Sequence, residues 1–201
     1  MGGWDSVGYF NRIASLYGKF PSISAPSSFY KEAASGLKGE YALDVACGTG
    51  NLSVLLGKDF NRVIGIDAAP NMIAISKQKA SRLRAGNVVF LLAKAQSLPF
   101  PDDTFDAVLC LNSIGLLGDD LKALSEMKRV LRPGGLLRCN VMVPSEWLDN
   151  FISEQKLLET ILKRLPGAKT SHARHLLGIL FRLVFDNVLI DWIKPSEEVP
   201  G

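Results

Sequence analysis

The sequence has few cysteines and histidines, and their scarcity excludes two kinds of site. Among 201 residues there are three cysteines and two histidines. Cys47, Cys110 and Cys139 form no C-x-x-C pair, and an odd number of cysteines does not suit a framework of disulfide bonds. We therefore expect no metal site and no disulfide scaffold, and we predict a protein of the reducing cytoplasm.

A strong excess of charge of one sign and an uninterrupted apolar run are also missing. Lysine and arginine together number 23 and the acids 20, a net charge of +3, whereas nucleic-acid-binding domains usually carry a larger basic excess. The C-terminal apolar run at 175–193 contains Arg182, Asp186 and Asp191, too many charges for a helix that crosses a bilayer. We expect no nucleic-acid partner and no stable membrane insertion. The run is predicted to lie in the core or in an interface, such as that of a homodimer.

Short apolar runs alternate with helical patterns through the middle of the chain. The runs are bounded by Gly, Pro, Asn or Asp and lie at 41–46, 62–67, 87–92, 105–111 and 135–143. Helical patterns lie between them, at 70–86 with Pro70 in its first turn and at 119–131 with Asp119 as its cap. This alternation predicts an α/β fold with a doubly wound, mostly parallel sheet and helices on both faces.

The two ends of the chain follow other patterns. An amphipathic helix is predicted over 8–20, followed by a Ser/Pro-rich loop and a second short helix. Another helix is predicted over 145–165. Residues 170–194 fit either a helix followed by one strand, or a hairpin that turns at Asp186 and Asn187, and we favour the hairpin.

Bare backbone follows the first apolar run, in "ALDVACGTG" at 42–50. A glycine-spaced turn between a strand and a helix lets the backbone approach a ligand closely. The next run ends about 20 residues on in Asp67, whose carboxylate can accept both hydroxyls of a ribose. Asp44 would repel a pyrophosphate but suits a ligand with an ammonium and a sulfonium, and Ser53 replaces the third glycine of the dinucleotide motif. These residues favour S-adenosylmethionine over NAD.

Four ordered blocks of the chain resemble the class I S-adenosylmethionine-dependent methyltransferases, and among them the ubiquinone and menaquinone C-methyltransferases. The blocks are "ALDVACGTG", "VIGIDAAPNMIAISKQKA", "LPFPDDTFDAVLCLNSI" and "MKRVLRPGGLL". The resemblance covers 41–143 well and "YFNRIASLYGKF" near the N-terminus more loosely. It implies a seven-stranded Rossmann-like sheet, with a helical lid segment at 1–40 ahead of a core at 41–201 that has an atypical C-terminal region.

The resemblance also implies a set of cofactor-binding positions. Those matching the methionine part of the cofactor are Asp44 and, through their backbone, Ala46, Cys47, Gly48 and Gly50. Asp67 matches the ribose-binding acid, and the positions beside the adenine are Ala68 and Met72. Met72 also fits the core of a helix, and nothing near Cys47 in the sequence would ionise its thiol for use as a nucleophile.

One position departs from the family's pattern. Relatives commonly read G-D-A-x-x-L-P-F where this chain reads "AKAQSLPF", so Lys94 stands where an acid usually accepts a hydrogen bond from the adenine amine. An ammonium cannot accept. We expect either that Lys94 turns to solvent while Ala95, through its backbone, and Gln96 serve the adenine, or that the cofactor binds weakly.

The sequence offers no clear catalytic base. Tyr9, Tyr17 and Asn112 are candidates on the acceptor side, although the tyrosines also fit simple packing; Asn112 ends the fourth run and is counted with the cofactor-binding residues as well. His172 and His175 fit ordinary helix positions. The sequence therefore predicts methyl transfer to a small, largely apolar acceptor. A methyltransferase fold that binds without catalysis, or an NAD-dependent dehydrogenase, are the alternatives.

Overall fold

The computed structural model describes residues 5–19, 25, 27–144, 169–170 and 185–194. Within them the chain forms five helices and seven strands, which alternate through its middle. In chain order they are α1 (Ser6–Lys19), α2 (Ser27–Ala34), β1 (Gly39–Val45), α3 (Asn51–Leu56), β2 (Phe60–Asp67), α4 (Pro70–Arg82), β3 (Val88–Leu92), β4 (Phe105–Cys110), α5 (Asp120–Val130), β5 (Leu131–Pro144), β6 (Lys169–Thr170) and β7 (Phe185–Ile193).

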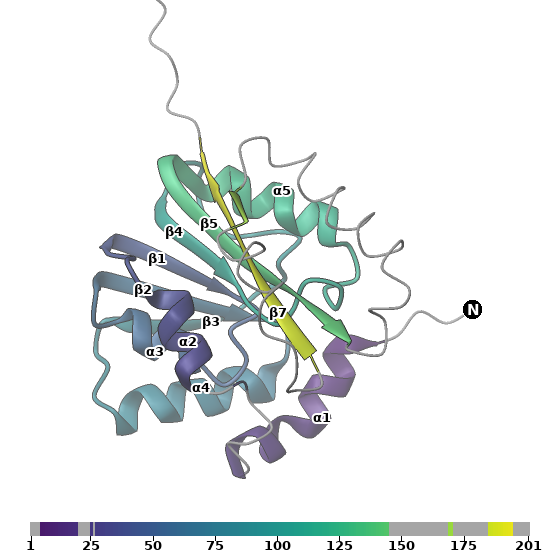
Figure 1. Ribbon diagram of the computed structural model, residues 1–201. Helices are drawn as coiled ribbons and strands as arrows, with labels where there is room; N and C mark the ends of the chain where they lie inside the picture. Colours follow the sequence, from purple (N-terminus) through teal and green to yellow (C-terminus); the bar gives the residue numbers. More distant parts are fainter. Residues whose placement is uncertain (1–4, 20–24, 26, 145–168, 171–184, 195–201) are drawn as a thin grey trace, which may run out of the picture.

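The strands form one sheet in the order β3-β2-β1-β4-β5-β7-β6 (Figure 1). The first five pair in parallel, and β7 pairs antiparallel with β5 on one side and β6 on the other. The predicted α/β fold with a mostly parallel sheet is confirmed. The seven-stranded expectation holds only in part, because six strands have ordinary length while β6 contributes two residues.

The predicted C-terminal hairpin is wrong. Asp186 and Asn187 lie inside β7, where they pair with Val143 and Met142 of β5. β5 pairs with β7 along the whole length of β7, so the backbone groups of β7 that face β5 have partners, which a turn at these two residues would leave partly unpaired. The helix predicted over 145–165 lies outside the described residues.

Side chains of the sheet alternate between two apolar layers. In β1, Leu43 and Val45 pack in the layer that contains α5, whereas Ala42 packs in the layer that contains α2, α3 and α4. These helices lie on opposite sides of the sheet (Figure 1). The alternation follows from the two-residue period of a strand, and it makes the sheet buried on both faces.

The helices begin and end with the chemistry that the sequence predicts. Pro70 occupies the first turn of α4, and the Asp119 side chain accepts a hydrogen bond from the Lys122 amide at the start of α5. Basic residues lie in the last turn of each helix. α4 ends at Arg82, several residues before the predicted limit.

The N-terminal helix α1 packs on α4. Ala14 of α1 and Met72 of α4 share one buried cluster, and the Asn71 amide donates to the side chain of Asn11 at 2.9 Å. β1 already begins at Gly39, so the boundary expected at residue 40 falls inside the first strand. Over the stretches that the structure describes, no helix combines the length and apolarity needed to cross a membrane.

Candidate cofactor site at the carboxyl edge of the sheet

The turn after β1 is built from left-handed backbone. Ala46, Gly48 and Gly50 have φ values of 55°, 54° and 78°, a region that residues with a Cβ rarely adopt. A Cβ on Gly50 would lie 2.7 Å from the Phe90 ring, whereas one on Gly48 would meet no atom within 4 Å. Packing therefore requires Gly50, and the space beside Gly48 is open to a ligand.

Asp67 joins the ends of β1 and β2. Its Oδ2 accepts the Gly48 amide at 2.9 Å, and its Oδ1 accepts the Ala69 amide at 2.8 Å. Burial raises the pKa of Asp67, and the backbone hydrogen bonds oppose that rise. Each carboxylate oxygen has two lone pairs, so both keep capacity for a further donor such as a ribose hydroxyl.

Asp44 is a buried acid beside the same turn. It is 2% exposed and accepts a hydrogen bond from the Ser53 hydroxyl at 2.5 Å. Burial, followed by the charge of Asp67, raises the pKa of Asp44 to about 7, although the Ser53 hydrogen bond opposes the rise. Within the described part of the chain, neither Asp44 nor Asp67 forms an ion pair. A ligand that brings a cation would complete this arrangement.

Cys47 contributes backbone to the turn. Its amide donates to the Ile66 carbonyl at 2.8 Å, and the Gly50 amide donates to the Cys47 carbonyl at 2.9 Å. Burial, followed by the charges of Asp44 and Asp67, holds the pKa of the Cys47 thiol well above its usual value. The thiol is therefore neutral at physiological pH and unsuited to act as a nucleophile.

At the end of β4, Asn112 is held by a second amide. The backbone of Asn112 has φ of 56°, and its backbone N–H donates to Asn140 Oδ1 at 2.6 Å. The side-chain Oδ1 of Asn112 accepts from Asn140 Nδ2 at 2.9 Å. Asn140 lies in β5 and is fully buried. The sequence reasoning missed Asn140, although one asparagine in the apolar run "LLRCNVMV" is a signal of a buried polar contact.

The segment expected to border the adenine lies beside this edge. Lys94 is exposed and Ala95 is buried, and both alternatives for the binding of the adenine stay predictions. Gln96 Nε2 donates to the Leu117 carbonyl at 2.5 Å. The Gln96 side chain is therefore oriented by its amide nitrogen, and its amide oxygen can act as an acceptor.

Three predicted residues lie on or against α1. Met72 of α4 is 2% exposed and packs against Ala14 of α1, which agrees with its predicted place in the core, while its contact with adenine stays a prediction. Tyr17 packs edge to face with Phe10, with ring centroids 6.5 Å apart, and burial raises its pKa. Tyr9 is 40% exposed on the same helix. Ala68 is half-buried directly after Asp67.

A polar group on the sheet face below the turn was also missed. Burial of the Tyr30 hydroxyl of α2, then the charge of Asp44, raises the pKa of Tyr30, and the Asn51 side chain opposes the rise. Lys79 Nζ donates to Thr49 Oγ1 at 3.1 Å and also to Asn51, and burial lowers the pKa of Lys79 to about 8. α2 and α4 thus support the turn through contacts that no local motif announces. His172 and His175 lie outside the described residues.

Comparison with known proteins supports a common ancestry for the central part of the chain. Residues 43–139 match the family model of a methyltransferase domain. The chain is 41% identical over 105 residues to the demethylmenaquinone methyltransferase of Staphylococcus aureus strain JH9, and 36% identical over 105 residues to that of Listeria monocytogenes serotype 4a. These alignments cover 51% of this chain but only 43% and 44% of the two relatives.

Solved structures share the fold over a longer part of the chain. The phosphoethanolamine N-methyltransferase 2 of Haemonchus contortus, solved in complex with S-adenosyl-L-methionine, superposes on 85% of this chain with a TM-score of 0.63 and 17% identity, over 52% of its own length. The cyclase SpnF superposes on 84% of this chain with a TM-score of 0.65 and 22% identity, over 80% of its own length. At these identities the likeness concerns the fold.

Proposed function

We infer that this chain transfers a methyl group from S-adenosylmethionine to a small, largely apolar acceptor. We propose that it does so with a class I S-adenosylmethionine-dependent methyltransferase domain similar to those of the quinone C-methyltransferases. One observation carries the inference. The buried acid Asp44 and the half-buried acid Asp67 lie beside a glycine turn with open space at Gly48, and neither makes an ion pair within the described residues. A site with one buried and one half-buried acid and no paired cation fits a ligand that brings its own positive charge.

We propose a separate role at this edge for each part of S-adenosylmethionine. We propose that Asp44 accepts a hydrogen bond from the ammonium of the methionine part and that the backbone at Gly48 lies against the same part. Asp67 is proposed to accept the ribose hydroxyls with the lone pairs that its two amide contacts leave over. Ala95 and Gln96 are proposed to meet the adenine.

The ligand supplies an electrophilic methyl group on a sulfonium. The protein's part is then to align the acceptor with that methyl group and to exclude water, because displacement at a sulfonium needs no proton donor. Asn112 lies at the same edge, with its amide oxygen already accepting from Asn140. Its amide N–H groups are therefore proposed to donate to an oxygen of the acceptor, and Tyr9 and Tyr17 remain candidates from α1.

A small ring-containing acceptor agrees with the names of the relatives and with the near-neutral charge of the chain. The acceptor is proposed to be a small molecule, with no nucleic-acid partner. The chain spans less than half the length of those relatives.

Calorimetric titration with S-adenosylhomocysteine and, separately, with NADH tests the proposed ligand. We expect S-adenosylhomocysteine to bind and to raise the melting temperature, since a ligand that binds only the native state stabilises it, and NADH to do neither. Binding of NADH alone would contradict the proposal in favour of a dehydrogenase. Transfer of labelled methyl from S-adenosylmethionine to a panel of reduced quinones and phenols then separates an enzyme from a protein that only binds.

A further inference from the structure

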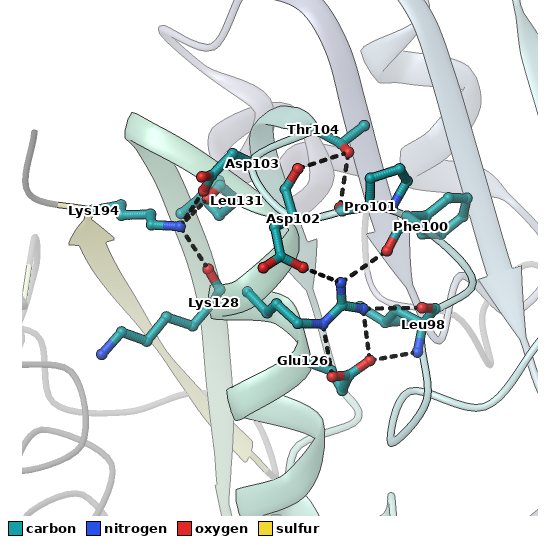
Figure 2. Close-up of polar contacts among 11 residues, drawn as sticks. Leu98, Phe100, Pro101, Asp102, Asp103, Thr104, Glu126, Lys128, Leu131 and Lys194 are labelled. Atoms are coloured by element: carbon teal, nitrogen blue, oxygen red, sulfur yellow. Dashed lines mark hydrogen bonds and ion pairs between the residues drawn. The ribbon is translucent and has the colours of Figure 1, made fainter.

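One side chain outside the candidate site forms hydrogen bonds with several residues of the loop at 98–102. Arg129, in the last turn of α5, donates to both carboxylate oxygens of Glu126, each at 2.9 Å, and to Asp102 Oδ1 at 2.7 Å. It also donates to the carbonyls of Phe100 at 2.8 Å and Leu98 at 3.0 Å. Figure 2 shows these contacts converging between α5 and the chain that leads into β4.

Glu126 completes the hold on Leu98. Glu126 Oε2 accepts the Leu98 amide at 2.8 Å, so both backbone polar groups of Leu98 are bound to the same pair of α5 side chains. The Glu126 side chain is 14% exposed and that of Arg129 31% exposed. The hydrogen bond from Arg129 is the main cause that lowers the pKa of Glu126 to about 2, which shows how closely the pair is joined.

Leu98 is the last residue of a segment that is anchored at three points. At its start the Ala93 amide donates to the Asp67 carbonyl at 3.1 Å, and in its middle Gln96 donates to the Leu117 carbonyl. At its end Leu98 is held by α5. Residues 94–97 therefore have a fixed path past the end of β2, although they form no helix or strand.

We propose that Arg129 and Glu126 are positioning residues for the purine of the methyl donor, and that they act through Leu98 on the backbone at residues 94–97. This inference rests on the proposed function. Lys94 cannot accept a hydrogen bond from the adenine amine, so recognition of the purine falls to backbone groups and to the amide oxygen of Gln96. Backbone groups cannot move independently of the chain. They can therefore distinguish one purine from another only if the segment that carries them is held rigidly.

The chain provides a matched control at the same end of the fold. Lys194, just after β7, donates to Asp103, to the Leu131 carbonyl at 2.7 Å and to the Lys128 carbonyl at 3.4 Å (Figure 2). This lysine has several partners as Arg129 does, but it makes no contact with residues 94–98 among the described contacts. Its loss therefore costs stability without releasing the segment.

The test compares Arg129→Lys with Lys194→Gln, using the binding of S-adenosylhomocysteine and of S-inosylhomocysteine, whose purine carries an oxygen in place of the amine. Lysine keeps the charge but cannot form the forked contacts of arginine. We expect Arg129→Lys to weaken binding of S-adenosylhomocysteine about tenfold and to reduce the preference for it over the inosine compound. We expect Lys194→Gln to lower the melting temperature while both dissociation constants stay within about twofold of the wild type.

Three results would overturn the proposal. In the first, Arg129→Lys keeps both affinity and purine preference; in the second, Lys194→Gln changes them as much as Arg129→Lys does. If Arg129→Lys fails to fold, the test uses Glu126→Gln in its place. The third result is then an unchanged purine preference in Glu126→Gln. If the wild-type protein does not bind S-adenosylhomocysteine, the proposed function itself is contradicted. This outcome is distinguished from the others because it is measured on the wild-type protein alone.

Discussion

Two regions of this protein contain acids that are shielded from solvent, and the pKa values of these acids are shifted in opposite directions. At the carboxyl edge, Asp44 and Asp67 are held by hydroxyl and amide groups alone, and burial raises the pKa of Asp44 to about 7. At the end of α5, Glu126 is joined to Arg129, which lowers the pKa of Glu126 to about 2. The second arrangement stabilises the charged acid, and the first does not.

The difference indicates which acid already has its counter-ion in the ligand-free protein and which lacks one. A buried carboxylate without a cation is unfavourable in the free protein, and folding alone gives no reason to keep one. A cationic ligand removes the disadvantage when it binds. Glu126 of α5 is already paired with Arg129 in the ligand-free protein. We therefore expect its substitution to lower the stability of the protein first.

Glu126→Ala is expected to have the largest effect on stability. It leaves the Arg129 guanidinium and the Leu98 amide without their main acceptor, and we expect a loss of about 2 to 3 kcal/mol in the free energy of unfolding, measured in urea. The control is Asp102→Ala, because the Asp102 side chain is 72% exposed and its pair with Arg129 should contribute less than about 1 kcal/mol. Equal losses for both variants would contradict the contrast.

Asp67→Ala is expected to affect binding first. Loss of a charge-assisted contact to the ribose should weaken S-adenosylhomocysteine by about 1 to 3 kcal/mol in calorimetry. Asp59→Ala is the control, since Asp59 is exposed just before β2, at the other end of that strand. Unchanged affinity in Asp67→Ala would remove this acid from the ligand site.

The affinity for S-adenosylhomocysteine should rise with pH. Asp44 has a pKa of about 7 in the free protein, so at pH 6 most of the carboxyl is protonated and cannot pair with the ligand's ammonium. We expect binding about tenfold tighter at pH 8 than at pH 6, which is about 1.4 kcal/mol. A flat profile in the wild type, or the same slope in Asp44→Asn, would be inconsistent with this role.

Asp44→Asn should stabilise the ligand-free protein slightly. Because the folded pKa of Asp44 lies above its ordinary value of 3.8, the ionised acid destabilises the fold as pH rises from about 4 through 7. Asparagine can still accept from Ser53 without a charge, so we expect a gain of about 1 kcal/mol in urea at pH 8 and none at pH 4. A loss at both pH values would show that Asp44 supports the fold.

The sequence predicted the parts of the site that lie close together along the chain. The glycine turn after β1 and the acid at the end of β2 were found because each follows an apolar strand, and parallel strands bring their carboxyl ends to one edge. The strand and helix alternation predicted the sheet for the same reason. Spacing along the chain was enough for these features.

Contacts between distant residues could not be predicted in this way. Asn112 and Asn140 are 28 residues apart, and only the pairing of β4 with β5 brings them together. Met72 fitted both the core of a helix and a place beside the adenine, and only the packing of α1 on α4 shows that it is buried. The hairpin at Asp186 was wrong because the free edge of β5 determined the path of β7.

The sequence by itself determined the order of strands and helices, the bare turn at Gly48 and the presence of the two acids, because these depend on local periodicity and on residue type. Only the tertiary structure decided that Asp44 is buried without a cation and that Leu98 is held from α5. The pairing of Glu126 with Arg129 is local by contrast, because the two residues are three apart on one helix. Burial and contacts between separate elements are properties of the assembled layers, since they depend on which distant groups the sheet and its helices bring within a few ångströms.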